Sequence, residues 1–193
     1  MNNETVTIVS GLPRSGTSMM MGMLEAGGLE VLTDGERKAD EDNPKGYYEF
    51  EKVKKLKDDS SWVPQAKAKV VKIVSALLQH LPPEYSYKVI FMLRDMEETV
   101  ASQKQMLVRR NEPTDRISDQ DLETISRNHL QEIDKWLAEQ LNFEVLYVNY
   151  NEVLNNPIRH SQEIRTFLGG SLDVAEMARV VDSNLYRQRR HRR

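Results

Sequence analysis

Four short apolar runs, separated by longer segments with the periodicity of helices, constrain the fold of this chain more than any other feature. They lie at residues 6–9, 69–74, 88–93 and 144–148. Short apolar runs bounded by turn residues are typical of strands buried on both faces of a sheet. Strands that alternate with helices favour a parallel sheet covered on both sides. We therefore predict an α/β fold of three layers, with a central and mainly parallel sheet of four to five strands flanked by helices.

Helices are predicted between these strands and after the last of them. The first ends near Ala26, because Gly27 and Gly28 follow it. Further helices are predicted at 49–58, before Pro82, at 95–110 with Asp95 as its cap, and at 118–141. Two or three helices close the chain. Segment 33–45 is polar and rich in turn residues, so we expect it to be an exposed loop.

The length and charge of the chain limit its class. The 193 residues suit a single domain, which we place at 1–185, followed by an arginine-rich tail at 186–193. Five arginines fall in the last seven residues while the net charge is −3, so the rest of the chain is acidic, which argues against nucleic-acid binding. No apolar run approaches the roughly 20 residues that span a bilayer. The polar N-terminus shows no signal peptide, and we predict a cytoplasmic protein.

Cysteine and histidine usage narrows the chemistry. The chain has no cysteine, which excludes disulfides, thiolate metal sites and a cysteine nucleophile. Its four histidines show no metal-ligand spacing, so we predict no metal site. The methionines at 19, 20, 21 and 23 are expected to pack their helix against the sheet rather than to bind a soft metal.

The loop between the first strand and the first helix has the composition of a phosphate-binding loop. It reads Gly-Leu-Pro-Arg-Ser-Gly-Thr-Ser from Gly11 to Ser18. Free backbone N–H groups at a helix start attract anions, and glycines let the backbone approach them closely. The common nucleoside-triphosphate loop has the pattern G-x-x-x-x-G-K-[ST], but Thr17 stands here where lysine is needed. Arg14 supplies a positive charge inside the loop instead, which counts against ATP or GTP hydrolysis.

A second motif follows the third strand. Arg94 comes at the carboxyl end of that strand, where open α/β sheets bind ligands. Ser102 lies two helical turns beyond Asp95. An arginine and a helix hydroxyl can make charge-assisted contacts to a phosphate.

Together the two motifs resemble those of the sulfotransferases that use 3′-phosphoadenosine-5′-phosphosulfate (PAPS). The P-R-S-G-T loop is similar to the 5′-phosphosulfate loop of tyrosylprotein and bacterial members. Arg94 and Ser102 match the 3′-phosphate motif in identity and spacing. Segment 43–49 resembles an N-P-x-G-x-x-E segment of bacterial members. Segment 150–157 resembles a Y-E-x-L-x-x-x-P segment, with Asn151 in place of the usual glutamate.

The resemblance implies an enzyme on a P-loop-like fold that moves a sulfuryl group from PAPS to a hydroxyl or amine acceptor. PAPS would be the co-substrate, with no metal. The implied donor-binding residues are Pro13, Arg14, Ser15, Gly16, Thr17, Ser18, Arg94, Ser102 and Tyr150. The implied catalytic residues are Arg14, Lys72 on the second strand, and Glu49.

The catalytic base has several candidates. Cytosolic members of the family carry a histidine two residues after the strand lysine, but Val74 stands at that position here. Tyrosylprotein and heparan-type members use a glutamate after the first helix, and Glu49 is the candidate by that analogy. Glu49 could equally stabilise a helix start through the helix dipole. Asp34 and Glu36 are the alternatives. We interpret His129, on the apolar face of helix 118–141, as a partly buried core residue.

Two other functions are compatible with the sequence: an ATP-dependent small-molecule kinase, and a nucleotide-binding module without catalysis. The acceptor could be a small molecule, a sugar, a lipid or a peptide. The arginine-rich tail could be disordered, could contact an acidic partner, or could reach the 3′-phosphate through Arg187 and Arg189. We favour the first of these three.

Overall fold

The computed structural model describes residues 4–37, 39–40, 46–114 and 116–182, and within them the chain forms a four-stranded parallel sheet. The strands are β1 (Thr5–Gly11), β2 (Val70–Lys72), β3 (Ser86–Leu93) and β4 (Phe143–Asn149). Their order across the sheet is β2-β1-β3-β4, and every neighbouring pair runs parallel. The predicted α/β class and parallel sheet are confirmed.

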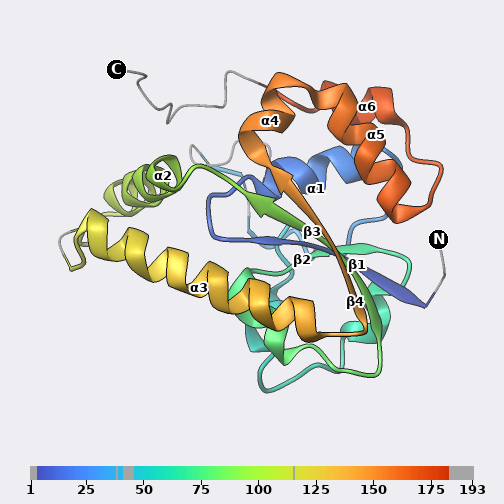
Figure 1. Cartoon of the computed structure of the whole chain (residues 1–193), viewed down its shortest axis with the longest axis horizontal. Helices are drawn as coiled ribbons and strands as arrows, with labels where there is room; N and C mark the ends of the chain where they lie inside the picture. The colour runs from blue at the N-terminus through green and yellow to red at the C-terminus, as the bar shows by residue number, and fades with distance from the viewer. Residues whose placement is uncertain (1–3, 38, 41–45, 115, 183–193) are drawn as a thin grey trace.

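Helices cover both faces of this sheet (Figure 1). One face carries α1 (Thr17–Ala26), α4 (Tyr150–Asn155), α5 (Pro157–Leu168) and α6 (Val174–Arg179). The other carries α3 (Asp119–Glu139) and three 3-10 turns, η1 (Glu51–Lys55), η2 (Val63–Ala66) and η3 (Ser75–His80). The remaining helix, α2 (Met96–Arg109), begins beyond the carboxyl end of β3 and lies beside α3.

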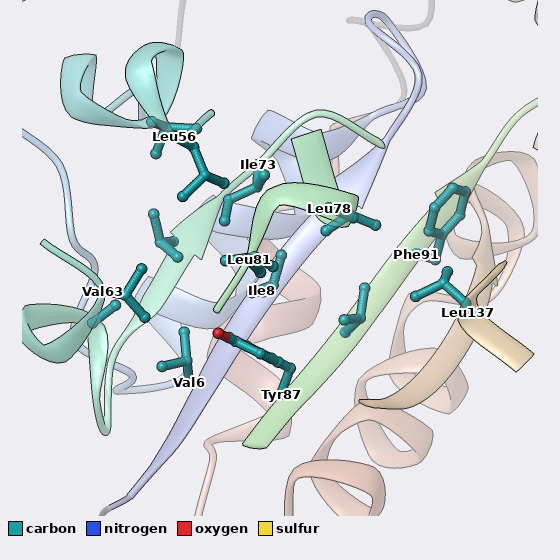
Figure 2. Packing of buried hydrophobic residues seen from close by; sticks show 14 of the residues in the cluster. Val6, Ile8, Leu56, Val63, Ile73, Leu78, Leu81, Tyr87, Phe91 and Leu137 are labelled. Atoms are coloured by element: carbon teal, nitrogen blue, oxygen red, sulfur yellow. The ribbon is translucent and has the colours of Figure 1, made fainter. Parts of the chain in front are cut away.

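Alternate residues of β1 supply the two cores. Ile8 belongs to a cluster with Phe91 and Leu137 on the α3 side, shown in Figure 2. Val9 belongs to the cluster on the α1 side, together with methionines 20, 21 and 23, which are fully buried. The methionine run therefore packs α1 against the sheet, as the sequence predicts. Burial on both faces explains why the neighbouring residues Ile8 and Val9, which belong to opposite cores, are both apolar.

The short elements differ most from expectation. The helix predicted at 49–58 is only the 3-10 turn η1, and the stretch before Pro82 is the 3-10 turn η3. Val53 in η1 and Leu56 directly after it are both buried, and their spacing of three residues suits a 3-10 turn. Asp95 caps α2 as predicted, by accepting a hydrogen bond from the Glu98 N–H.

The polar segment after the first helix is described only in part. Its residues 33–36, 39 and 40 are exposed, in agreement with the predicted loop, while 38 and 41–45 lie outside the described residues. The arginine-rich tail also lies outside them. Among the helices in the described ranges, none is both long and apolar enough to cross a membrane.

Candidate functional site

The loop after β1 passes so close to its neighbours that two of its positions require glycine. Gly11 and Gly16 have φ angles of 142° and 98°. A Cβ at Gly11 would lie 2.6 Å from the Met92 carbonyl oxygen, and a Cβ at Gly16 would lie 2.4 Å from the ring of Tyr150. Arg14 also takes a left-handed conformation, with φ 73°, which is uncommon for a residue with a side chain. Such strain is typical of functional loops.

Tyr150 lies beneath this loop. It begins α4 directly after β4 and is buried, with 6% of its surface exposed. The guanidinium carbon of Arg94 lies 4.7 Å from the centre of the Tyr150 ring. The ring therefore contacts both the phosphate loop at Gly16 and the arginine of the second motif.

The two motifs predicted to bind the nucleotide touch each other. Arg94 Nη1 donates to the Arg14 carbonyl oxygen at 3.1 Å, and Arg14 Nε donates to Ser102 Oγ at 3.0 Å. Because β1 and β3 are parallel neighbours, their carboxyl ends deliver the loop and the start of α2 to the same edge of the sheet. Residues 80 and 88 positions apart thus form one site.

Lys72 joins this site from the end of β2, on the other side of β1. Its Nζ lies 3.4 Å from Ser18 Oγ and 3.9 Å from Glu49 Oε1, and it donates to the Tyr47 carbonyl oxygen. Burial lowers the pKa of Lys72 to about 8, with Arg37 and Arg14 acting in the same direction against the opposing charge of Glu49. A buried lysine beside a helix start suits an anionic ligand, because the ligand's charge would stabilise the protonated form that burial disfavours.

Glu49 faces the same space and is held by cations. Its Oε1 accepts a hydrogen bond from Arg37 Nη1 at 2.5 Å, and its Oε2 lies 3.8 Å from Lys54 Nζ. The 3-10 turn η1 begins only at Glu51, whose N–H donates to Asp34 Oδ2 at 2.6 Å. Asp34, rather than Glu49, therefore accepts the hydrogen bond from the N–H group at the start of η1.

A strained segment carries Glu49. Tyr48 has a φ of 53°, and its hydroxyl donates to Glu25 Oε2 on α1 at 2.8 Å. Burial and the Glu25 carboxylate raise the pKa of Tyr48 to about 12, so this phenol stays a donor. The guanidinium of Arg37 stacks 3.3 Å from the centre of the Tyr47 ring. Segment 46–49 is therefore fixed to α1 on one side and to Arg37 on the other.

A cavity of about 250 Å³ unites these groups. Of the residues predicted for the site, those lining it are Pro13, Arg14, Gly16, Thr17, Ser18, Glu49, Lys72, Arg94, Ser102 and Tyr150. Ser15 does not line it: its side chain is buried beneath the loop, where its Oγ has no hydrogen-bond partner. The alternative bases Asp34 and Glu36 do not line it either. Within the described ranges, no group of three or more histidine, aspartate and glutamate side chains could hold a metal ion.

Comparison with known protein families identifies the family of this chain. A family model described as a sulfotransferase domain matches residues 4–191. The chain belongs to the sulfotransferase domain family. A search of curated proteins finds no match for it.

Solved structures of other sulfotransferases share the fold of this domain. Mouse sulfotransferase SULT7A1, complexed with PAP, is 18% identical with a TM-score of 0.55, over 93% of this chain and 63% of that one. The sulfotransferase domain of the Synechococcus PCC 7002 olefin synthase is 15% identical with a TM-score of 0.54, over 97% and 84%. The Alicyclobacillus acidocaldarius sulfotransferase is 12% identical with a TM-score of 0.52, over 89% and 85%. The domain thus spans less than two thirds of the mouse protein.

The cavity of this sulfotransferase domain is also lined by residues that the sequence did not indicate. Met106 and Arg109 line it from α2, four and seven residues after Ser102. That spacing places them on the same helix face as Ser102, so helical periodicity could have indicated them. Arg37 carries no such signal, because it lies in a polar loop among other charges.

His129 has a structural contact outside the cavity. It is half-buried, and its Nε2 lies 2.9 Å from Ser75 Oγ at the start of η3. This contact joins α3 to the segment that follows β2. The prediction of a partly buried packing residue agrees with this placement.

Proposed function

We propose that this sulfotransferase domain transfers a sulfuryl group from PAPS to a hydroxyl or amine acceptor and releases 3′,5′-bisphosphoadenosine (PAP). The contact between the two motifs, through Arg94, Arg14 and Ser102, is the observation that carries the proposal. A nucleotide with phosphates on the 5′ and 3′ positions of one ribose needs two adjoining anion sites. Mouse SULT7A1 and retinol dehydratase, two proteins of this fold, were solved with PAP.

In this proposal the start of α1 binds the sulfated end of the donor. The N–H groups of Gly16 to Ser18 and the hydroxyls of Thr17 and Ser18 would face the 5′-phosphosulfate, where the helix dipole favours negative charge. Arg14 would add a cation, while Arg94 and Ser102 would bind the 3′-phosphate. Tyr150 would support both ends from below. Ser15 would contribute its backbone rather than its buried hydroxyl.

The transfer itself would be an in-line displacement at sulfur. The acceptor oxygen or nitrogen forms a bond to sulfur while the bond from sulfur to the 5′-phosphate oxygen breaks. Lys72 would stabilise the negative charge that develops on that oxygen, because its ammonium lies beside Ser18 in the first turn of α1. Glu49, 3.9 Å from Lys72, would accept the proton from the acceptor.

Calorimetry with nucleotides tests the proposal against its alternatives. We expect PAP to bind at least about tenfold more tightly than Mg-ATP, because the 3′-phosphate of PAP, which ATP lacks, would contact Arg94. ATP binding as tightly as PAP would favour a kinase and contradict the proposal. PAP binding without transfer from labelled PAPS to any acceptor would indicate a binding module without catalysis.

The acceptor and the cellular location each need an experiment of their own. Labelled PAPS offered with small alcohols, amines, sugars, lipids and peptides would identify the acceptor class by the labelled product. The cytoplasmic location stays a prediction from the sequence, and fractionation of cells that produce the protein tests it.

A further inference from the structure

Arg94 is held by Glu98, and Glu98 is in turn held by Asn151 from another part of the fold. Its Nε donates to Glu98 Oε2 at 3.2 Å, one helical turn along α2. The same Glu98 oxygen accepts a hydrogen bond from Asn151 Nδ2 of α4 at 3.0 Å. Glu98 is 4% exposed, and the side chain of Arg94 is 8% exposed. The buried carboxylate of Glu98 therefore lies between Arg94 and the side-chain amide of Asn151 on α4.

The caps at the ends of β3 and β4 fix Glu98 and Asn151. Asp95 Oδ1 accepts a hydrogen bond from the Glu98 N–H at 3.2 Å. Asn149 Oδ1 accepts one from the Asn151 N–H at 2.9 Å. Because β3 and β4 are parallel neighbours, these two caps lie side by side and bring Glu98 and Asn151 together.

These contacts leave the guanidinium little freedom to rotate. Glu98 binds Nε, the Arg14 carbonyl oxygen binds Nη1, and the Tyr150 ring covers a face. Charge-assisted hydrogen bonds of a planar guanidinium fix direction as well as distance. We propose that Glu98 and Asn151 are positioning residues that orient Arg94 and so set the selectivity of the donor site for a 3′-phosphate. This inference rests on the proposed function, in which Arg94 binds that phosphate.

Because Glu98 is negatively charged, the proposal can be tested by whether phosphate binding weakens or strengthens when the carboxylate is removed. The negative charge of a carboxylate beside Arg94 repels a bound phosphate. If this repulsion were the only effect of Glu98, removing the carboxylate would strengthen phosphate binding. Orientation predicts the opposite, because a guanidinium without its partner can turn away from the ligand. Glu98→Gln keeps the shape and an acceptor oxygen, whereas Glu98→Ala removes the contact.

The experiment measures the ratio of the Kd values for 5′-AMP and PAP by calorimetry on the full chain. These probes differ only in the 3′-phosphate, so the ratio isolates its site from general damage to the pocket. We expect Glu98→Ala to reduce the ratio about tenfold, the scale of one charged hydrogen bond, and Glu98→Gln to reduce it less than about threefold. Glu97→Gln, which removes the charge of the exposed neighbour, is the matched control and should keep the ratio.

A second variant keeps the test valid if Glu98→Ala does not fold. Asn151→Ala removes the amide that donates to Glu98 at 3.0 Å and changes no charge. An effect of charge repulsion alone predicts an unchanged ratio, whereas loss of orientation should reduce the ratio at least about threefold.

An unchanged ratio in Glu98→Ala and Asn151→Ala, or an equal loss of affinity for both probes, would overturn the positioning role. A wild-type protein that binds 5′-AMP as tightly as PAP would instead contradict the proposed function itself. The two failures are therefore distinguishable.

Discussion

The proposed donor end and the proposed acceptor end of the cavity are built differently. The donor end consists of strand ends and helix starts: the loop between β1 and α1, the start of α2 and the start of α4. The acceptor end, around Glu49 and Arg37, consists of loop segments joined by side-chain contacts. Backbone elements of the sheet hold the first in place, whereas the second depends on an ion pair and a strained turn. This difference explains why motifs indicate most of the donor end, whereas at the acceptor end segment 43–49 indicates Glu49 and no motif indicates Arg37.

The largest expected effect is at the acceptor end. Glu49→Gln should lower kcat about 1000-fold while the Kd for PAP stays within about threefold, because a general base acts on the acceptor proton alone. Steady-state kinetics with labelled PAPS and calorimetry with PAP measure the two quantities. Glu51→Gln, which alters a carboxylate paired with Lys54 outside the cavity, is the control and should keep full activity. Full turnover by Glu49→Gln would remove Glu49 as the base and leave the acceptor end without a catalytic carboxylate.

The next effect concerns the donor end. Arg94→Ala should weaken PAP binding about 100-fold, because it removes the charged contacts to the 3′-phosphate. It should also lower the free energy of unfolding by about 3 kcal/mol, because the buried Glu98 loses its cation. Calorimetry and urea denaturation test the two parts. Arg127→Ala, which breaks an exposed pair with Glu123 on α3, should leave both quantities nearly unchanged. Unaltered PAP affinity in Arg94→Ala would remove the 3′-site assignment.

Lys72 lies between the two ends, and its pKa of about 8 predicts a pH dependence. Below pH 8 the free protein carries a cationic Lys72, whereas above it the lysine loses its proton before the anionic donor binds. A bound phosphosulfate favours the cation, so the pKa rises in the complex and binding takes up a proton above pH 8. The Kd for PAPS should therefore be level below pH 8 and rise up to about tenfold per pH unit above it.

Lys72→Arg provides the control for this profile, since arginine stays charged throughout the range. Titrations between about pH 6.5 and 9.5 should show the break in the wild type and a level profile in the variant. A break that persists in Lys72→Arg would assign the titration to another group.

The smallest effect tests the anchoring of the acceptor end. Tyr48→Phe removes the hydrogen bond to Glu25 but keeps the ring, and should lower kcat about threefold with little change in PAP binding. Tyr147→Phe is matched to it, because Tyr147 also donates to a carboxylate, that of Asp134, away from the cavity. Equal kinetics for Tyr48→Phe and the wild type would show that segment 46–49 is held in place without the hydrogen bond from Tyr48 to Glu25.

Much of the donor end could be predicted from the sequence because its signals are local. An apolar strand, two glycines and a hydroxyl run at the start of α1 define the loop within a few residues. The contact between Arg14 and Ser102 follows once β1 and β3 are known to be parallel neighbours.

The remaining parts depend on tertiary packing that no local pattern encodes. The pairing of Glu98 with Asn151 joins residues 53 positions apart, and each alone reads as an ordinary helix residue. Arg37 contacts Tyr47 and Glu49, the two neighbours of Tyr48, whose left-handed turn gives no signal in the sequence because Tyr48 is not a glycine. The 3-10 turns η1 and η3 read as helices in the sequence, because periodicity alone does not separate the two kinds of helix in short segments.

A crystal structure of the protein with PAP would test the central claim most directly. We expect the 3′-phosphate within hydrogen-bond distance of Arg94 and Ser102, and the 5′-phosphate at the N–H groups of Gly16 to Ser18. A complex in which PAP lies outside this cavity, or in which its 3′-phosphate points to solvent away from Arg94, would contradict the account.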